Sequence, residues 1–423
     1  MVTLGTLVVA LAPALLTWGW IFVTWLVLWL AWEGYLLQKR NDYFDGMQWA
    51  YLQVQIPELT ELTPKSMDNI IAVMSGMHKN PDLAEKYFEG YLEDWYSLEM
   101  QCLKGRVRYI VVVPQARRQF MEGVIYGQYP TAQITEVEDY TKEFHVDGIR
   151  TEFDLYGTDI WLSQPDCYPI RTYQMYTDKL APKDKFVDPH KALVEAYTNL
   201  HPGEQIWLQV LVRPVGGRLI DEWSKKAEAE IARIRGVAGK IQGGIFKRAA
   251  RGTARFLGNI LRQLGGLTPE ASSSEDEEVR FFDPVETAKM EGILQKTVRE
   301  PFQTVIRIVY VAPLGQLHSP SLGRIMGALQ QFNTLHLNSF QRDASTNSRK
   351  PDYFFKEHRR AFRERMQYYY YRIRWLGGVT RGMMMTAEEI ATVYHFPAKW
   401  VRTPGLERPK SGVHAAPKGV PFV

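Results

Sequence analysis

Residues 106–113, RVRYIVVV, are predicted to form a β-strand in the interior of a sheet. The last five of them are aromatic or β-branched, and such unbroken apolar runs are typical of fully buried strands. Pro114 ends the run, and Lys104 and Gly105 join it to another strand expected over residues 91–103. The sequence therefore predicts two adjacent strands inside a sheet.

The same structural unit extends to both sides of these strands. A strand is predicted over residues 48–57, and a helix follows from Ser66, whose side chain is a suitable N-cap. After the central strands come a helix over residues 117–129 and a strand over residues 132–137. The order β-α-β-β-α-β is typical of a ferredoxin-like unit.

A second unit of the same kind is predicted in residues 146–345, interrupted by a basic helical insertion at residues 221–282. Its elements are expected over residues 148–162, 190–199, 205–213, 304–312, 322–332 and 335–340. The expected fold class is α+β, with a transmembrane helix before two ferredoxin-like α/β units. The divisions are an anchor (1–40), the two units (45–145 and 146–345), C-terminal helices (350–400) and an extended tail (401–423).

The N-terminal segment has the composition of a membrane-spanning helix. Residues 1–32 contain no Asp, Glu, Lys or Arg, and a bilayer core needs about 20 apolar residues. No basic residue precedes the apolar run and bulky residues follow it, which favours an uncleaved anchor over a signal peptide or a buried helix of a soluble core. Positive charge directly after the run places the remainder in the cytoplasm, with a single pass through the inner membrane. The anchor positions are Leu7, Trp18, Trp25, Leu30, Lys39 and Arg40.

The overall composition sets wide limits on function. The chain has 423 residues, of which 23% are charged, and a formal net charge of +4. That charge is too small to indicate a polyanionic partner, so any interaction with nucleic acid has to depend on local clusters. Cys102 and Cys167 are too few and too far apart for a disulfide framework, and they fit a reducing compartment.

The first basic cluster lies within the insertion. Residues 240–264 place apolar side chains near one face and cations on the others. Three interpretations stay open: contact with an anionic membrane surface, contact with a protein or nucleic acid, and a flexible insertion. The acidic residues 271–278 are predicted to be a solvated linker. The cations include Lys247, Arg248, Arg251 and Arg255.

The second basic cluster is a helix predicted over residues 353–375. Its apolar residues recur at helical spacing and are expected to pack against a core. Rings interleaved with cations are also typical of surfaces that bind single-stranded nucleic acid, which is the alternative. The apolar residues are Phe355, Phe362, Met366, Tyr369 and Ile373, and the cations include Arg359, Arg360 and Arg363.

No motif in the sequence predicts catalysis. The chain has no G-x-x-x-x-G-K-[ST] loop, no G-x-S-x-G elbow, and no His or Cys residues at metal-ligand spacing. We therefore expect no catalytic, cofactor-binding or metal-binding residues and a protein that is not an enzyme. An enzyme of unknown type is the remaining alternative.

Two short stretches carry a resemblance to a known group of proteins. Residues 385–397, MTAEEIATVYHFP, predict a short helix with Thr386 as N-cap and Glu389 in a capping box. They resemble a signature that precedes the ATPase core of type IV secretion and conjugation ATPases of the HerA/FtsK class. Residues 125–130, IYGQYP, and 136–140, EVEDY, resemble part of an uncharacterised domain N-terminal to such ATPases in candidate-phyla bacteria.

This resemblance implies a function that composition alone does not. In that group a membrane anchor and this domain precede a motor, whose P-loop motif is missing from this sequence. We therefore expect a membrane-anchored cytoplasmic scaffold that positions a separate ATPase or secretion component and forms a homo-oligomer. Membrane-associated nucleic-acid binding is the alternative. The expected docking residues are Glu388, Glu389, Ile390, Tyr394, His395 and Pro397, together with the tail at residues 403–423.

Overall fold

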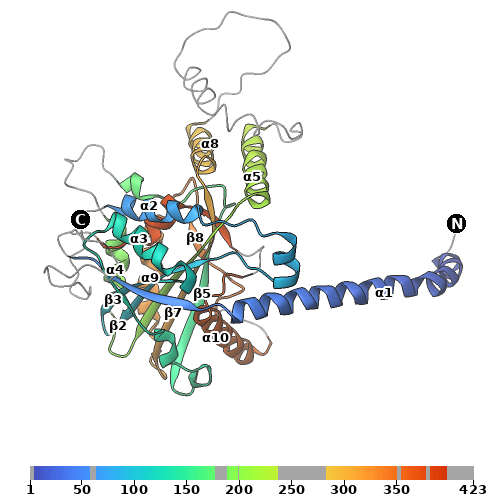
Figure 1. Cartoon of the computed structure of the whole chain (residues 1–423), viewed down its shortest axis with the longest axis horizontal. Coiled ribbons are helices and arrows are strands. Elements are labelled where there is room, and N and C mark those ends of the chain that lie inside the picture. The colour runs from blue at the N-terminus through green and yellow to red at the C-terminus, as the bar shows by residue number, and fades with distance from the viewer. Residues whose placement is uncertain are drawn as a thin grey trace, which may run out of the picture.

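The computed structural model describes residues 4–57, 63–176, 188–198, 200–236, 283–349, 354–377 and 382–397, with side chains from residue 20 onward. These residues form a mixed α/β structure with an antiparallel sheet of nine strands, from which a long helix projects (Figure 1). The strand order is β4-β1-β3-β2-β6-β7-β5-β8, and β9 (Met383–Thr386) also pairs with β7.

The projecting helix is α1 (Leu4–Asp45). Only residues 46–48 separate it from the first strand, β1 (Trp49–Gln55). From Trp20 to Asp45 the helix is long and apolar enough to cross a membrane, and 6% of its apolar stretch is buried. Its apolar side chains are therefore not part of the core of the folded body.

The first half of the sheet contains the elements predicted around the central strands. They are β1, α2 (Pro64–Ser75), β2 (Tyr96–Leu103), β3 (Arg106–Pro114), α3 (Arg118–Gln128) and β4 (Gln133–Glu136). β3 lies between β1 and β2, as its apolar run predicts. β2 begins at Tyr96 rather than at residue 91, because Tyr91 packs against Tyr43 of α1 instead of joining the sheet.

The second half repeats this succession of elements. They are β5 (Phe153–Leu162), α4 (His190–Thr198), β6 (Gln205–Pro214), β7 (Pro301–Pro313), α9 (Ser319–Leu329) and β8 (Phe340–Arg342). β2 and β6 pair along their whole length, so both halves share one continuous sheet. The last strand starts only at Phe340, because the Asn338 side chain ties the preceding loop to three backbone carbonyls of residues 164–168.

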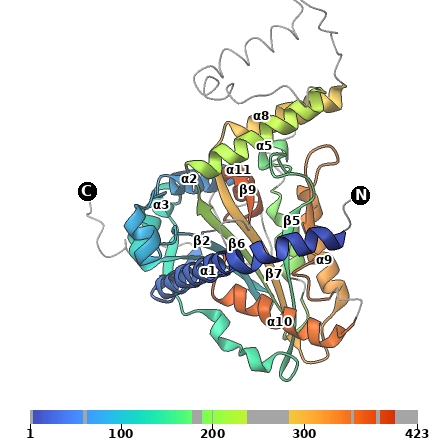
Figure 2. The same ribbon diagram turned by 90° about the vertical axis from the view of Figure 1, so that its right-hand side faces the viewer.

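One face of the sheet is covered by α2, α3, α4, α9 and α11 (Ala387–Val393), as Figures 1 and 2 show. Side chains at every second strand position, such as Leu52, Val111 and Leu208, pack there against helix residues such as Ile390. The alternation predicted for residues 205–213 is therefore confirmed on this face.

The opposite face is covered by α10 (Lys356–Arg372), which crosses β5 and β7 (Figure 2). The packing predicted for this helix is wrong, because Phe355, Phe362 and Tyr369 are 79%, 66% and 52% exposed. The helix turns its tyrosines inward: Tyr368 and Tyr371 pack on apolar sheet residues such as Val309, and the buried Glu364 pairs with Arg150 just before β5. Its buried residues are Glu364, Gln367, Tyr368 and Tyr371.

Two further helices project together from the body. α5 (Arg218–Arg235) contains the polar helix predicted at 221–235, whereas α8 (Pro284–Thr297) lies outside the predicted elements. They share a small core that includes Ile231 and Ile293. Most of the predicted insertion, with residues 240–264 and 271–278, lies outside the described residues, as does the tail at 401–423.

Candidate functional site at the base of the apolar helix

A row of polar side chains crosses the sheet on the face beneath α10. Glu99 on β2 lies opposite Gln209 on β6, Gln209 lies opposite Arg307 on β7, and Arg307 lies opposite Asp159 on β5. All four residues are buried. Because side chains alternate along a strand, these four lie on the side of the sheet opposite to the apolar core.

Hydrogen bonds join this polar row from end to end. Gln209 Nε2 donates to Glu99 Oε1 at 3.0 Å, and Arg307 Nη1 donates to Gln209 Oε1 at 3.0 Å. Arg307 Nε donates to Asp159 Oδ1 at 2.8 Å. Because a carboxylate accepts and a guanidinium donates, only one orientation of the Gln209 amide satisfies both neighbours.

Arg374 closes one end of the polar row from the segment that follows α10. Its guanidinium donates to Glu99 (Nε to Oε1, 3.0 Å) and to Asp139 (Nη1 to Oδ2, 2.5 Å; Nη2 to Oδ1, 2.9 Å). Tyr140 donates a further hydrogen bond to Glu99 at 2.8 Å. Two buried carboxylates therefore share one buried cation, and removal of that cation leaves both without a counter-charge. We call Arg374, Glu99 and Asp139 the ion cluster.

The protonation states of the ion cluster follow from burial and from its pairs. Burial opposes the charged form of Asp139, but the charge of Arg374 and hydrogen bonds from Arg374 and Thr141 hold the pKa of Asp139 below its usual range. Burial raises the pKa of Tyr51 to about 12, so its hydroxyl stays protonated and donates to Asp139 at 3.2 Å. Asp139 and Arg374 therefore stay charged near neutral pH.

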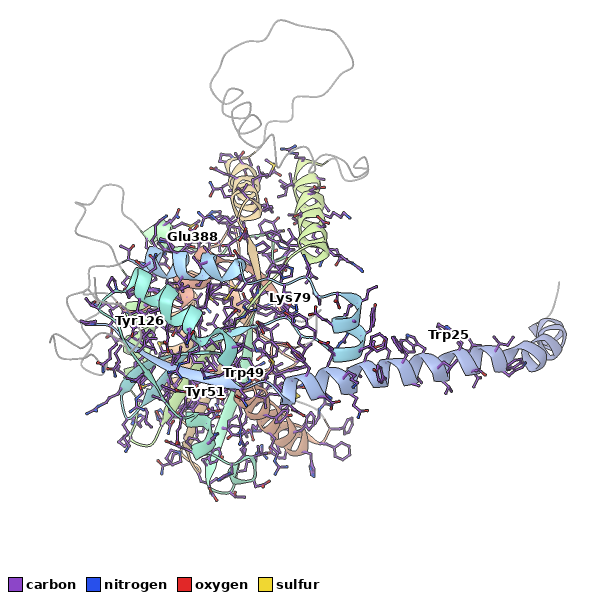
Figure 3. The ribbon with its side chains drawn as sticks, in the orientation of Figure 1. Trp25, Trp49, Tyr51, Lys79, Tyr126 and Glu388 are labelled. Atoms are coloured by element: carbon purple, nitrogen blue, oxygen red, sulfur yellow. The ribbon has the colours of Figure 1, made fainter. Side chains whose placement is uncertain are left out.

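An aromatic layer joins the base of α1 to the ion cluster. The Phe44 ring stacks on Trp95 and meets Trp375 edge-on, with ring centroids 5.8 Å apart in both pairs. Trp95 Nε1 donates to the Arg374 carbonyl at 2.8 Å, which joins this aromatic layer to the ion cluster. Figure 3 shows Trp49 and Tyr51 where the chain passes from α1 into the sheet. The root of α1, β1 and the ion cluster thus form one packed unit.

A second contact holds α1 further along its length. Trp32 lies against Tyr87, with ring centroids 6.0 Å apart. Gly90 has a φ of +70°, and a Cβ at this position would collide with the backbone of Lys39. Glycine is required here both for its conformation and for the close approach of the two backbones. Two separated contacts therefore fix the direction in which α1 leaves the body.

The predicted anchor residues all lie on α1. Trp25 and Leu30 are exposed, and Figure 3 shows Trp25 well away from the body. Lys39 and Arg40 lie on the part of α1 beside the body. The side chains of Leu7 and Trp18 lie outside the described residues.

The residues predicted to dock a partner are buried. Glu388, Glu389, Ile390, Tyr394 and His395 are at most 6% exposed, and Pro397 is buried as well. The predicted capping box between Thr386 and Glu389 is confirmed at the start of α11. Because all six residues lie inside the fold, their side chains do not offer a docking surface on the folded body.

The two glutamates of this motif instead hold α11 against α8. Glu389 forms an ion pair with Lys296 at 3.0 Å and accepts a hydrogen bond from the Ile170 N–H at 2.9 Å. Glu388 pairs with Arg299. The Lys296–Glu389 pair is buried on both sides, so it depends on the exact position of both helices.

His395 belongs to a buried cluster with Asp188 and His190. Its Nε2 lies 2.9 Å from Asp188 Oδ1 and its Nδ1 lies 2.8 Å from the Ala391 carbonyl oxygen, so the doubly protonated ring satisfies both contacts. Burial and the charge of His395 lower the pKa of His190 to about 3. The neutral His190 ring bridges the Tyr109 hydroxyl at 3.1 Å and the carbonyl of residue 393 at 2.9 Å.

The predicted basic residues do not form one patch of free cations. Arg360 pairs with Glu364 at 2.9 Å, Arg363 donates to the carbonyl of residue 347 at 2.9 Å, and Arg359 also has a partner. Lys247, Arg248, Arg251 and Arg255 lie outside the described residues.

The polar row and the ion cluster are enclosed and internally satisfied. No polar side-chain atom of Glu99, Gln209, Arg307, Asp159, Asp139 or Arg374 is buried without a hydrogen-bond partner. In the part of the chain that the structure describes, no group of three or more His, Cys, Asp or Glu side chains is placed to hold a metal ion. The arrangement therefore suits a rigid connection between helix and sheet.

Sequence reasoning missed the polar row. The signal that could have found it is a polar residue in the middle of an apolar strand, such as Gln209 within IWLQVLV and Arg307 within TVIRIVY. A residue of this kind in a buried strand needs a polar partner from a neighbouring strand.

Comparison with known proteins identifies a family without an assigned function. No curated protein matches the chain. A family model described as "Domain of unknown function (DUF8128)" matches residues 63–409, a range that contains eight of the nine strands, the polar row and the motif at residues 385–397. The matched range begins after α1 and β1. The chain therefore belongs to the DUF8128 family of domains of unknown function.

Proposed function

We propose that this protein is a membrane-tethered scaffold. In this proposal α1 crosses the cytoplasmic membrane once, and the sheet with its helices lies in the cytoplasm and positions a partner there. The observation that carries the proposal is the attachment of α1 at two separate points, Phe44 and the Lys39–Gly90 contact, above the ion cluster. A helix attached in this way holds the body in one orientation relative to the membrane, which a flexible linker would not do.

The composition of α1 supports the membrane part of this proposal. Trp20, Trp25, Trp29 and Trp32 remain exposed on the helix, and such a surface is unfavourable in water. The first charged residue of the chain is Glu33. Lys39 and Arg40 follow it beside the body, and positive charge next to a membrane span favours the cytoplasmic side.

The enclosed buried charges support a role without catalysis. The ion cluster is used within the fold, and so is the Lys296–Glu389 pair. Buried pairs of this kind specify geometry in some proteins, which fits a scaffold.

The partner is proposed from the resemblance of residues 385–397 and 125–140 to the domain that precedes secretion and conjugation ATPases. We infer a separate ATPase or secretion component that binds an exposed part of the body, and a homo-oligomer that matches a ring-shaped motor. The burial of α11 moves the expected contact away from the motif itself.

We also infer that the sheet consists of two ferredoxin-like units. The order β4-β1-β3-β2 in the first half corresponds to β8-β5-β7-β6 in the second half, with β2 and β6 at the junction. The polar row crosses this junction between Glu99 and Gln209. This placement supports a role of the polar row in keeping the two units in one orientation.

Insertion and orientation are testable in the full chain with one introduced cysteine. Cys102 and Cys167 are buried, and burial raises the pKa values of their thiols to about 12 and about 11, so neither reacts readily. L335C places a thiol at a fully exposed position. We expect the protein to resist alkaline extraction of membranes, and an impermeant maleimide to label L335C only after the cells are opened.

Two outcomes contradict the proposal. If alkaline extraction releases the full chain, α1 is not a membrane anchor. If L335C is labelled in intact cells, the body does not lie in the cytoplasm. The matched variant L28R/L30R puts charges into the apolar stretch and is expected to shift the protein to the soluble fraction. A pull-down from detergent extracts that recovers no ATPase contradicts the proposed ATPase partner.

A further inference from the structure

The outer side of α10 carries a stripe of exposed rings. Phe362 and Tyr369 are seven residues apart, which places them along one side of the helix, and Phe355, the residue before the helix, is 79% exposed. Phe354, just before α10, is 85% exposed. A cluster of large exposed rings on a folded body indicates an interaction surface.

This ring stripe lies on the side of the body from which α1 projects. α10 covers the sheet face that holds the root of α1, and Trp375, just after α10, contacts Phe44 of α1. Figures 1 and 2 show α10 beside the base of α1 on this side. A membrane crossed by α1 therefore faces the outer side of α10.

Apolar side chains beside α1 extend the same surface. Leu83 and Phe88 are 74% and 65% exposed, and Tyr87, next to Phe88, contacts Trp32 of α1. Trp32 directly precedes the first charged residue of the chain, so this contact lies at the expected end of the membrane span. Two segments far apart in the sequence thus expose apolar groups on the membrane side.

Cations accompany the rings on α10. Lys356 and Arg365 are exposed and form no ion pair within the described residues. Beside α1, Lys86 Nζ lies 5.3 Å from the centre of the Tyr87 ring. Aromatic side chains together with Lys and Arg are the composition of helices that lie in the plane of a membrane surface, where the cations meet anionic headgroups.

We propose that the outer side of α10, together with Leu83 and Phe88, binds the surface of the membrane that α1 spans, in contact with anionic lipid headgroups. This inference rests on the proposed function, because it requires α1 to cross the membrane. The rings enter the headgroup layer, and Lys356 and Arg365 pair with lipid phosphates. The body is then held against the bilayer by a second contact that is independent of the root of α1.

Single-stranded nucleic acid also stacks on exposed rings, but the charges of α10 favour the membrane. A groove for nucleic acid needs cations that follow the phosphate backbone. Arg359, Arg360 and Arg363, which the sequence suggested for this role, have partners within the body. These three arginines therefore do not supply the row of free cations that a nucleic-acid groove needs.

The test uses the full chain in vesicles of phosphatidylcholine and phosphatidylglycerol at three to one. An environment-sensitive fluorophore is attached to F362C, and a matched one to L335C, in the loop whose Leu337 packs with α5 and α8 on another side of the body. We expect blue-shifted emission at position 362 and quenching by a lipid-borne quencher, and neither effect at position 335. In the F362C chain, the added changes K356E and R365E are expected to weaken both signals.

Vesicle flotation separates this inference from the proposed function. A chain that floats with the vesicles while the fluorophore at 362 stays unquenched overturns the second contact and leaves α1 as the anchor. A chain that does not float overturns the proposed function itself. A blue shift at 362 that a single-stranded oligonucleotide produces and lipid does not overturns the membrane as the partner of this surface.

Discussion

The two faces of the sheet differ in one respect, although the same strands supply both: a row of hydrogen-bonded polar side chains crosses only the face beneath α10. On the face covered by α2, α3, α4, α9 and α11, Leu208 and Ile308 belong to one apolar core. On the other face their sequence neighbours Gln209 and Arg307 belong to the polar row that ends at Arg374. The second face also carries apolar side chains such as Trp207 and Leu211, and it receives α10 and the root of α1.

This difference indicates that the two faces have different structural roles. Apolar burial is non-directional, and a core of roughly the right volume folds with many combinations of side chains. Hydrogen-bonded ion pairs depend on exact geometry, and breaking one leaves a buried charge without its partner. The polar row and the ion cluster therefore specify the position of the root of α1 on one face, as the Lys296–Glu389 pair specifies that of α8 and α11 on the other.

Replacement of Arg374 by Met is the strongest way to break the polar face. It leaves the carboxylates of Glu99 and Asp139 buried without their cation, and loss of one member of a buried pair costs about 3–5 kcal/mol. We expect the free energy of unfolding to fall by that amount, measured by urea titration of the full chain in detergent with circular dichroism. The control R365M removes an exposed cation from α10 and should change it by less than about 0.5 kcal/mol. Equal effects of R374M and R365M contradict the role of the ion cluster.

The pH dependence of stability tests the other face of the sheet, where His190 is buried as a neutral ring. Its pKa is lowered from 6.5 to about 3, so between these values the unfolded chain binds a proton that the folded chain does not. The free energy of unfolding should therefore fall as the pH drops from about 6.5 toward 3, by at most about 1.4 kcal/mol per pH unit from this residue.

The matched variants for this pH series are H190Q and H336Q. H190Q should flatten the pH dependence, because glutamine does not titrate, whereas H336Q changes an exposed histidine and should leave it unchanged. Asp188, whose pKa is held low by the His395 charge against the effect of burial, adds to the loss of stability below its ordinary pKa of 3.8. Identical pH profiles for H190Q and the unmodified chain would falsify the assignment.

The smallest expected difference in stability is between a substitution on β6 and one on the neighbouring strand β7. Q209M removes the central member of the polar row and leaves Glu99 and Arg307 each short of one hydrogen bond, which should cost about 1–3 kcal/mol. I308V shortens a side chain on the apolar face and should cost about 0.5–1.5 kcal/mol. The urea titration described above compares them, and a larger loss for I308V than for Q209M reverses the ranking of the two faces.

Much of the sheet could be predicted from the sequence because its strands carry a strong local signal. The run at residues 106–113 and the alternation at 205–213 are confirmed as β3 and β6, and the capping box at Thr386 is confirmed at α11. These features depend on neighbours in sequence, so periodicity and capping chemistry suffice to find them.

The candidate site could not be predicted because it depends on strand register. Glu99 and Asp159 meet Gln209 and Arg307 only after β2, β6, β7 and β5 are aligned. Tertiary contacts also decide which side of α10 is buried: Tyr368 and Tyr371 pack on the sheet and Glu364 pairs with Arg150, whereas Phe362 stays exposed. The spacing of apolar residues therefore found the helix but not its buried side, because partners distant in sequence select that side.

The short connection between α1 and β1 has a mechanical consequence. β1 pairs with β3 on one side and β4 on the other, and in Figure 1 the blue strand after α1 continues in nearly the same line as the helix. Antiparallel hydrogen bonds run perpendicular to the strands. Tension along the helix therefore pulls β1 lengthwise and loads the rungs of both ladders together in shear, instead of peeling them one after another.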